Sequence, residues 1–464
     1  MIFKAFYLGC LSHASYLIGD EKTKRAVVVD PQRDVEVYLK EAKARGLKIA
    51  HVVLTHFHAD FVAGHLELRR LTGDAIHLGA QAKAEYSFSP LSDGTTIELG
   101  SVRLQALETP GHTPEAVCLL VFDLKKSAQK PHAVLTGDTL FIGDVGRPDL
   151  MASSGISAKA LASKLYDSLR KKLLALPDAT LVYPGHGAGS LCGKSLSDEL
   201  VSTIGKQKRY NPALRPMTRP QFVTLVTADQ PEAPSYFAHD ARLNKRRRPT
   251  LEEALKKLKP LAFAAALKKV KAGAQVLDTR DAAAFAAGHL RGSVNVGLGG
   301  RFASFAGMVL DPGKPLVLVC DAGREKETLL RLARVGLEAG VAGYLQGGIG
   351  SVPPQHLARM TRLTPAQLRE RLDSMFPPAV LDVRTDGERA ASSIPGSVHV
   401  PLLQLPRRLK DVPRASELVV HCAGGYRSAI AASMLMAAGR SHVSDLDGGM
   451  AAWQESAMSK RKPA

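Results

Sequence analysis

Four apolar segments in the first half of the chain each lead into a turn that contains a histidine or an aspartate. The segment from His51 to Leu54 precedes His56, and the segment from Ala133 to Leu135 precedes Asp138. Apolar runs of this length, closed by glycine, threonine or proline, are typical of buried strands. The other two are an alternating stretch from Ile97 to Leu107, which we expect to be one strand before His112, and Leu181 to Tyr183 before His186.

A helical pattern alternates with these strands. Apolar positions recur at helical spacing from Val35 to Arg45, after the apolar run Ala26 to Val29 and before the strand that leads to His56. A β-α-β order predicts a layered α/β fold. Because the histidines and aspartates follow the strands, and do not lie on helix faces or within strands, we expect them to form one functional site.

The residues in these turns are suited to metal binding. Neutral imidazole is the commonest protein metal ligand, and a nearby carboxylate can bind the ion or orient the imidazole. The first turn contains the motif His56-x-His58-x-Asp60. A single His-x-His could equally be a polar turn without a ligand role. Its occurrence together with His112, Asp138 and His186 favours a metal site. His13, in the segment from Leu11 to Tyr16, is expected to be a satisfied structural histidine rather than a ligand.

The second half of the chain contains one pattern twice. Val276 to Arg280 matches Val380 to Arg384, 104 residues later, and Gly347-Gly348 matches Gly448-Gly449, 101 residues later. Strand-helix alternation in each copy predicts two α/β domains with parallel sheets. We therefore predict domains over residues 1–245, 260–355 and 362–464. The basic run from Lys245 to Arg248 is expected to lie in a solvated linker.

A candidate reactive thiol lies in the second copy. An apolar strand ends at Cys422, and an apolar helix starts near Ser428, after the segment Ala423-Gly424-Gly425-Tyr426-Arg427. Successive backbone amides in such a loop, together with a helix N-terminus, form an anion-binding nest that favours a thiolate. An inert buried cysteine is the alternative, but burial alone does not require this loop chemistry.

The equivalent loop of the first copy departs from this pattern. When residues are counted back from the paired glycines, Asp321 falls opposite Cys422 and Glu325 falls opposite Tyr426. An acidic loop would repel an anionic sulfur donor, so we predict that this copy is catalytically inactive. A gap of one residue elsewhere would instead place Cys320 at the cysteine position.

Charge and composition narrow the classes of function. The chain of 464 residues has a formal net charge of +18, which attracts anions. Since no aromatic-rich RNA-binding signature or Cys/His finger accompanies the charge, we expect small anionic partners and no nucleic acid.

No apolar run is long enough to span a membrane, and no leader is recognisable, so we expect a cytoplasmic protein without a membrane span. Five cysteines, an odd and sparse set, argue against a disulfide framework.

In order and spacing, the metal-site motifs resemble those of the metallo-β-lactamase superfamily. They are His56-x-His58-x-Asp60, Gly111-His112, Gly137-Asp138 and Gly185-His186. The resemblance implies an N-terminal αββα sandwich with metal at one edge. Binuclear zinc hydrolases of this superfamily continue the first motif with a histidine, but the chain has Phe61, whose ring cannot bind a metal. The difference fits the persulfide dioxygenase branch, which keeps one ferrous ion.

That resemblance implies one Fe(II) in the N-terminal domain, bound by His56, His112 and Asp138. Two imidazoles and one carboxylate on one face leave positions open for O2 and substrate. The residues expected to support these ligands from outside are His58, Asp60 and His186.

Arg147 corresponds to an arginine that binds the anionic thiol cosubstrate in this branch, and a guanidinium suits a carboxylate. Alternatively, Arg147 pairs with a neighbouring aspartate, Asp144 or Asp149. Cys192 follows His186 in a glycine-rich loop, where members with fused rhodanese domains also carry a cysteine. Lys194 could lower the pKa of this thiol so that it acts in catalysis. Alternatively, Cys192 is a small buried hydrophobic residue.

The Cys422 loop resembles that of rhodanese sulfurtransferases. Four residues separate Cys422 from Arg427, one fewer than in the related phosphatase loop, which must hold a larger phosphate. The resemblance implies that Cys422 is the nucleophile that carries a persulfide and that Arg427 helps to hold the anionic donor. Two rhodanese-like α/β domains would then follow the sandwich.

Together, these resemblances imply a persulfide dioxygenase that oxidises glutathione or coenzyme A persulfide with O2 to sulfite. Its rhodanese domain would give or use thiosulfate. We also expect a homo-oligomer. One alternative is a zinc-dependent thioester hydrolase of the glyoxalase II type, fused to a sulfurtransferase. The other is a basic scaffold or nucleic-acid-binding protein with degenerate sites.

Overall fold

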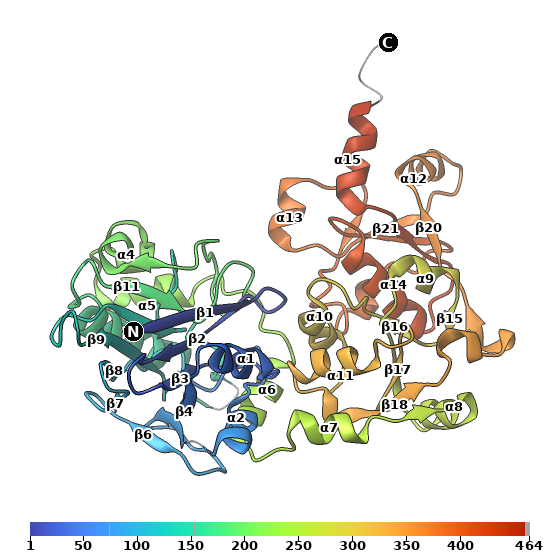
Figure 1. The fold of residues 1–464 in the computed structure, drawn as a ribbon. Coiled ribbons are helices and arrows are strands. Elements are labelled where there is room, and N and C mark those ends of the chain that lie inside the picture. Colours follow the sequence, from blue (N-terminus) through green and yellow to red (C-terminus); the bar gives the residue numbers. More distant parts are fainter. Residues whose placement is uncertain (74, 153–154, 460–464) are drawn as a thin grey trace. The chain divides into compact units, whose positions relative to one another are not determined.

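The computed structural model describes residues 1–73, 75–152 and 155–459, which form two compact units (Figure 1). Unit 1 comprises Met1–Ala254 and Ala333–Gly336, and unit 2 comprises the other described residues from Leu255 onward. Each unit has sheets and apolar cores of its own. None of the helices formed by the described residues has the length and apolar character needed to cross a membrane.

Unit 1 contains two six-stranded sheets, with strand orders β1-β2-β3-β4-β5-β6 and β12-β11-β10-β9-β8-β7. The strands of the first sheet are β1 (Ile2–Leu8), β2 (His13–Gly19), β3 (Arg25–Val29), β4 (Lys48–Val53), β5 (Ala75–Gly79) and β6 (Ser89–Leu91). Those of the second are β7 (Thr96–Glu98), β8 (Val102–Glu108), β9 (Val117–Asp123), β10 (Ala133–Gly137), β11 (Leu181–Pro184) and β12 (Ser202–Thr203).

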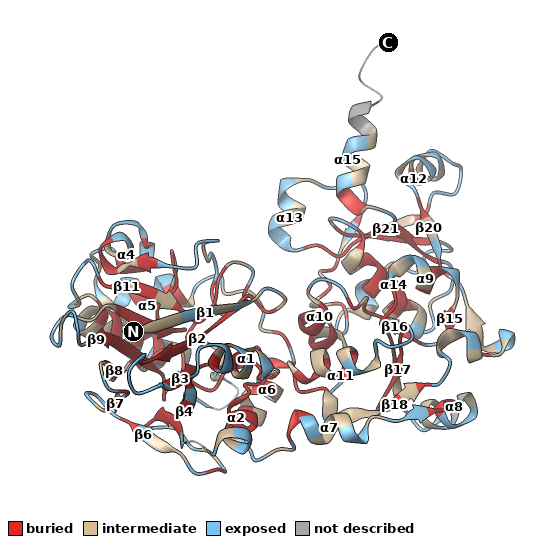
Figure 2. Ribbon diagram, viewed as in Figure 1, coloured by how far each residue is buried: buried red, intermediate tan, exposed pale blue. Residues whose placement is uncertain are grey.

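An apolar core lies between the two sheets and includes Ile18 and Val29 from the first and Leu104 and Leu119 from the second. The helices of this unit are α1 (Glu36–Ala44), α2 (His65–Thr72), α3 (Ala158–Asp167), α4 (Ile204–Tyr210), α5 (Arg219–Thr227) and α6 (Phe237–Lys245). Side chains of α1 and α2 pack on the outer face of the first sheet, and those of α3, α4 and α5 on that of the second. In Figure 2, the buried residues are concentrated on the strands. This αββα layering confirms the predicted fold class.

The stretch from Ile97 to Leu107 is a hairpin, so the prediction of a single strand was wrong. β7 and β8 pair antiparallel, and the amide of Leu99 donates to the carbonyl of Val102 across the turn. Gly100 has a φ of 104°, which a residue with a side chain rarely adopts. The apolar positions change phase at this turn, from Ile97 and Leu99 to Val102 and Leu104, and the sequence analysis overlooked this break.

The basic run predicted to be a solvated linker is partly structural. Lys245 ends α6, and α7 (Leu251–Lys257) begins soon after it. The Arg248 side chain is only 4% exposed, and its Nη1 lies 2.9 Å from Oε1 of Glu67. A buried guanidinium is tolerated because a buried carboxylate is paired with it. The linker prediction was therefore wrong for Arg248.

Unit 2 contains two five-stranded parallel sheets of matching topology, with orders β13-β18-β17-β14-β16 and β20-β24-β23-β21-β22. The strands of the first are β13 (Pro260–Leu261), β14 (Gln275–Asp278), β16 (Val294–Asn295), β17 (Leu316–Val319) and β18 (Val341–Leu345). Those of the second are β20 (Thr361–Leu363), β21 (Ala379–Asp382), β22 (Val398–His399), β23 (Leu418–His421) and β24 (Val443–Leu446). A small sheet pairs β15 (His289–Leu290) with β19 (Leu357–Ala358).

The helices of unit 2 are α8 (Phe263–Lys271), α9 (Ala282–Ala287), α10 (Phe302–Val309), α11 (Glu325–Ala333), α12 (Pro365–Leu372), α13 (Asp386–Ala391), α14 (Tyr426–Ala437) and α15 (Gly449–Ser459). Helix α14, which follows Cys422 in the second copy, contacts the first copy. The hydroxyl of Tyr426 donates to the carbonyl of Gly297 at 2.6 Å, and the amide of Asn295 donates to Oγ of Ser433 at 2.8 Å. The first copy therefore helps to fix the helix that follows Cys422.

Candidate metal centre and sulfur-transfer loop

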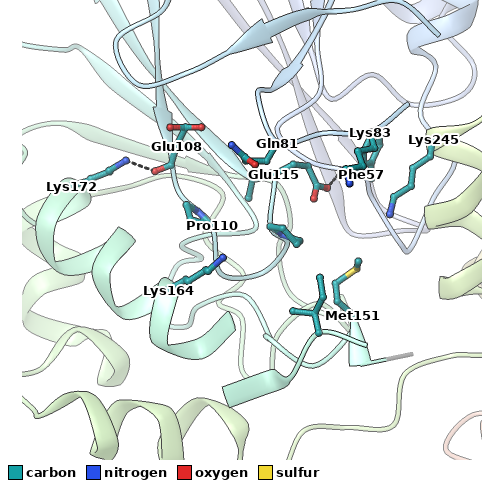
Figure 3. Close-up of a pocket in the computed structure, with 13 residues that line it drawn as sticks. Phe57, Gln81, Lys83, Glu108, Pro110, Glu115, Met151, Lys164, Lys172 and Lys245 are labelled. Atoms are coloured by element: carbon teal, nitrogen blue, oxygen red, sulfur yellow. Dashed lines mark hydrogen bonds between the residues drawn. The ribbon is translucent and has the colours of Figure 1, made fainter. Parts of the chain in front are cut away.

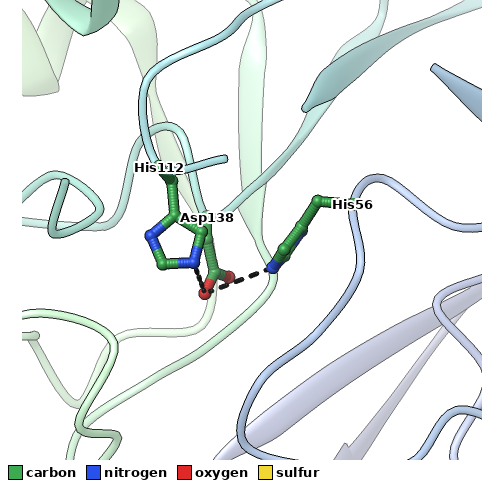
Figure 4. A group of neighbouring side chains, drawn as sticks. All are labelled: His56, His112 and Asp138. Atoms are coloured by element: carbon green, nitrogen blue, oxygen red, sulfur yellow. Dashed lines mark ion pairs between the residues drawn. The ribbon is translucent and has the colours of Figure 1, made fainter. Parts of the chain in front are cut away.

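Three loops of unit 1 bring His56, His112 and Asp138 together (Figure 4). His56 follows β4, His112 lies between β8 and β9, and Asp138 follows β10. The Oδ2 of Asp138 lies 3.8 Å from Nε2 of His56 and 3.6 Å from Nε2 of His112. Two atoms bound to one ion at about 2.0–2.2 Å can lie at most about 4.4 Å apart, and both separations are below this limit. The three side chains therefore have the geometry to share a single metal ion.

Hydrogen bonds on the far side of each imidazole leave its Nε2 available to a metal. Nδ1 of His112 donates to the carbonyl of Arg147 at 2.9 Å, and Nδ1 of His56 lies 3.0 Å from Oγ1 of Thr55. Among the described residues, neither Nε2 of His56 nor Oδ2 of Asp138 has a hydrogen-bond partner, although both are buried. Such atoms, together with partners that fix the ring orientation, are what a metal site requires.

The electrostatics produce two neutral imidazoles beside one carboxylate. Burial lowers the pKa of His56 well below its ordinary value, and burial also lowers the pKa of His112 despite the opposing charge of Asp138. Burial acts to raise the pKa of Asp138, but the charge of His186 outweighs burial and holds that pKa well below the ordinary value. These protonation states are those that metal ligands need.

The three residues predicted to support the ligands lie around this group. Nε2 of His58 is 3.0 Å from Oδ1 of Asp30. His186 lies between two carboxylates, with Nδ1 2.8 Å from Asp138 and Nε2 2.8 Å from Asp60. Burial lowers the pKa of His186, but Asp138 and Asp60 outweigh burial and raise it well above its ordinary value. His186 is therefore held as a cation between two anions.

The aromatic ring of Phe61 packs against the histidines beside this group. Its ring centroid lies 3.9 Å from that of His13 and 4.3 Å from that of His58. His13, expected to be structural, is buried beside the cluster, with its ring centroid 5.6 Å from that of His186. No pattern in the sequence links His13 to the other histidines.

Cys192 lies with Asp60 and His186 in a second buried group, and the ligand atoms of the three are within 4.8 Å of one another. Burial raises the pKa of the Cys192 thiol well above its ordinary value, and Asp60 adds to the effect. Lys194 does not lower this pKa as predicted, because its ammonium donates to the carbonyls of Leu225 and Ala228. That part of the prediction was wrong.

Arg147 is almost completely buried and pairs with Asp149, one of the alternatives left open by the sequence. Its Nε and Nη2 each donate to the Asp149 carboxylate at 2.7 Å, and its Nη1 donates to the carbonyl of Leu191 at 3.1 Å. Its own carbonyl accepts the bond from His112. Binding of a substrate carboxylate by Arg147 would require the pair with Asp149 to open.

Asp30 is a supporting residue that the sequence analysis missed. It follows β3 with a φ of 52°, and it accepts bonds from the amide of Thr55 at 2.7 Å and from Oγ1 of Thr55 at 2.8 Å. It thereby connects Thr55, which contacts His56, with His58. The available signal was an aspartate at the end of an apolar strand, the same signal that marks Asp138.

In unit 2, the loop after β23 brings one backbone amide and one hydroxyl to the Cys422 sulfur. The amide of Gly425 donates to Sγ at 3.1 Å, and Oγ of Ser428 lies 3.5 Å from Sγ. Gly425 has a φ of 95°, which turns the loop into α14. Arg427 is held beside the loop by Glu388, whose carboxylate accepts two bonds at 2.6 and 2.7 Å. The loop can thus stabilise a thiolate or persulfide anion.

The strand register corrects the alignment of the two copies. Asp278 pairs with Val319 in the first sheet, as Asp382 pairs with His421 in the second. The next residues, Cys320 and Cys422, are therefore equivalent, and the count that placed Asp321 opposite Cys422 was wrong. The segment from the cysteine to the paired glycines is therefore one residue longer in the first copy, from Cys320 to Gly347, than in the second, from Cys422 to Gly448. A count back from the glycines cannot detect this difference.

The first copy keeps the cysteine but changes the loop around it. Glu325 takes the position of Arg427, and its Oε1 accepts a bond from the amide of Gly323 at 3.3 Å. Gly323 corresponds to Gly425, whose amide serves the sulfur in the second copy. Burial also raises the pKa of Cys320. An internal carboxylate thus uses the amide that an anionic sulfur would need.

Comparisons with known proteins agree with this division of the chain. Residues 8–186 match the family model of the Metallo-beta-lactamase superfamily, and residues 262–352 and 364–456 each match that of the Rhodanese-like domain. The mitochondrial persulfide dioxygenase ETHE1 of Bos taurus is 30% identical over 205 residues, which span 43% of this chain and 70% of that protein. The chain belongs to the metallo-β-lactamase superfamily.

Other members of the superfamily show the range of relatives. The cytoplasmic hydroxyacylglutathione hydrolase of Arabidopsis thaliana is 35% identical over 186 residues, or 39% of this chain and 67% of that protein. A solved metallo-beta-lactamase from Staphylococcus aureus subsp. aureus COL is 31% identical with a TM-score of 0.64, and the match covers 74% of this chain and 98% of that one. The matched 74% of this chain is more than the residues of unit 1, so the match extends into unit 2.

The superfamily domain is therefore joined to two rhodanese-like domains, which confirms the resemblance found in the sequence. Persulfide dioxygenase relatives at one end and sulfurtransferase-type domains at the other support a role in sulfur metabolism.

Proposed function

We propose that unit 1 is an Fe(II)-dependent persulfide dioxygenase and that the C-terminal domain is a sulfurtransferase. The observation that supports the first activity best is the group of two neutral imidazoles and one carboxylate, His56, His112 and Asp138. Non-haem iron oxygenases use this ligand set. Phe61 occupies the position at which binuclear hydrolases have a further histidine, and so favours one ion over two.

In the proposed reaction, a persulfide RSSH, O2 and water give the thiol RSH, sulfite and two protons. His56, His112 and Asp138 would hold the Fe(II), which would supply the redox chemistry between O2 and the terminal sulfur. The chain holds the ligand orientations through Thr55 and through the carbonyl of Arg147, and it keeps bulk water from the buried side chains. His186 keeps Asp138 ionised, so that the carboxylate stays available to the metal.

In the second proposed reaction, a Cys422 persulfide passes its outer sulfur to sulfite. The sulfite sulfur forms a bond to the outer sulfur, the S–S bond of the cysteine persulfide breaks, and thiosulfate leaves while Cys422 returns to the thiolate. The amide of Gly425 stabilises the anionic sulfur of Cys422, and Arg427 attracts the anionic donor or acceptor. The reverse reaction loads Cys422 from thiosulfate. We propose that the first rhodanese-like domain is inactive.

A comparison of two assays tests this proposal. Protein purified anaerobically is assayed for O2 uptake and sulfite with glutathione persulfide and coenzyme A persulfide, and for hydrolysis of S-lactoylglutathione. Uptake of one O2 per persulfide, abolished in His56→Ala, supports the dioxygenase. Zinc in the protein with thioester turnover and no O2 uptake would support a hydrolase, the activity in the name of the Arabidopsis thaliana relative.

The partners in this proposal are small: thiol persulfides, O2, sulfite and thiosulfate. A cytoplasmic location, a homo-oligomeric state and the absence of nucleic acid partners remain predictions from the sequence.

A further inference from the structure

A cavity of about 610 Å³ adjoins the loops that carry the metal ligands in unit 1 (Figure 3). Phe57, which follows His56 directly, forms part of its wall, as do Pro110 and Pro114 on either side of His112. The amide of Phe57 donates to Oε1 of Glu115 at 3.0 Å, which ties the two loops together along this wall. A molecule in the cavity would lie against both histidine loops.

Four lysines surround the cavity. In Figure 3, Lys164 and Lys172 approach from helices on one side, and Lys83 and Lys245 lie on the other. Lys172 is already engaged, because its ammonium contacts the Asp93 carboxylate at 2.5 and 2.8 Å and the carbonyl of Glu108 at 2.6 Å. The other three are partly or fully exposed.

The ammonium groups of Lys83, Lys164 and Lys245 have no ion pair or hydrogen bond with any described residue. Lys245 lies over the ring of Phe57, 5.4 Å from its centroid. Two glutamates also line the cavity, but Glu115 is buried and bonded to the Phe57 amide, and Glu108 lies beside Lys172. Three cations are therefore available to an anionic ligand around a space of ligand size.

Apolar side chains complete the lining. Met151 and Ile156 face the cavity together with Phe57 and the two prolines. This combination suits a molecule with an apolar arm and a distal end of high negative charge. Lysine ammonium groups bind phosphate as point charges. A thiol with only carboxylates, such as glutathione, carries an ammonium that offsets one of its two carboxylates, and it could use fewer of the three cations.

We propose that this cavity binds the carrier portion of the persulfide and selects thiols whose distal end bears several phosphates, of the coenzyme A class. This inference rests on the proposed dioxygenase function and names its substrate class. The apolar arm would lie along Met151 and Phe57, and the phosphates would contact Lys83, Lys164 and Lys245. The thiol end would lie towards the loops of His56 and His112.

Binding of the plain thiols tests the proposal without requiring turnover. Calorimetry under anaerobic conditions compares coenzyme A, 3′-dephospho-coenzyme A and glutathione on the metal-loaded protein. The variant is Lys83→Gln/Lys164→Gln/Lys245→Gln. The matched control replaces three exposed lysines elsewhere in unit 1: Lys22→Gln/Lys126→Gln/Lys130→Gln. Metal content confirms that each variant keeps its centre.

We expect the cavity variant to bind coenzyme A about tenfold or more weakly than the control variant. Glutathione should change much less, and 3′-dephospho-coenzyme A should lie between them. High salt should weaken coenzyme A binding in the control variant but have little effect in the cavity variant. Equal coenzyme A affinities in the two variants, or equal losses for coenzyme A and glutathione, would overturn the proposal.

Oxygen uptake separates this proposal from the one on which it rests. If the cavity variant raises KM for coenzyme A persulfide while kcat stays unchanged, both proposals are supported. If coenzyme A binds through the lysines but no persulfide drives O2 uptake, the dioxygenase assignment fails and the binding site stands. If both persulfides are oxidised and the lysine substitutions leave KM unchanged, the binding site fails and the dioxygenase stands.

Discussion

Nδ1 of His186 lies 2.8 Å from Oδ1 of Asp138, so the other oxygen of that carboxylate, Oδ2, remains facing His56 and His112. The imidazolium is held in turn by Asp60. His186 therefore orients the Asp138 carboxylate, and it compensates the charge of two buried carboxylates. Removal of such a partner changes the affinity of a metal site although the ligands themselves remain.

Replacement of His186 by glutamine should lower iron affinity by about 10–100-fold, because Asp138 loses its orienting cation. Persulfide oxidation should fall in proportion at limiting iron, while sulfur transfer by the C-terminal domain should not change. Competition with a chelator measures the affinity. His132→Gln, a half-buried histidine away from the centre, is the control. Unchanged iron affinity in His186→Gln would show that the contact is not needed.

The equivalent cysteines of the two rhodanese-like domains should behave differently. Cys422→Ser should reduce thiosulfate sulfurtransferase activity on the order of 10³-fold, since it removes the nucleophile. Cys320→Ser should leave the activity within about twofold, because Glu325 occupies the loop amide that a persulfide would need. Cyanide-dependent thiocyanate formation measures both variants. A loss in Cys320→Ser comparable to that in Cys422→Ser would mean that the first domain takes part in transfer.

The ion pair of Glu388 with Arg427 should make the C-terminal domain sensitive to acid. Hydrogen bonding to Arg427 lowers the pKa of Glu388 from 4.5 to about 2. A carboxyl whose pKa is lower in the folded state contributes stability above pH 4.5 and loses it as pH falls towards 2. Glu388→Gln should therefore reduce the free energy of unfolding by about 1 kcal/mol at pH 6, since the partly exposed pair is screened by solvent.

Trp453, the single tryptophan of the chain, reports unfolding of this domain through its fluorescence. The difference between the native protein and Glu388→Gln should shrink as the pH is lowered from 5 to 3. Glu370→Gln, at an exposed glutamate of the same domain, provides the control. A difference that does not depend on pH would contradict an electrostatic origin.

The site residues that come directly after apolar strands could be predicted from the sequence. His56, His112, Asp138 and His186 all follow apolar strands, and the sandwich brings these ends to one edge. Asp30 also follows an apolar strand, β3, but it was missed.

Other features depend on distances that a sequence does not contain. Arg147 had two aspartates within reach, and only the folded loop shows that Asp149 accepts bonds from its Nε and Nη2. Proximity in sequence suggested that Lys194 acts on Cys192, but the lysine turns away to backbone carbonyls. Lys83, Lys164 and Lys245 come from separate elements, so no local pattern connects them.

The nature of the reaction at His56, His112 and Asp138 is tested most directly by one titration. Protein prepared anaerobically with a measured metal content receives a limiting amount of coenzyme A persulfide, and O2 uptake and sulfite are counted together. We predict one iron per chain, and one O2 consumed and one sulfite formed per persulfide. Protein that contains zinc, hydrolyses a thioester and consumes no O2 would contradict the account.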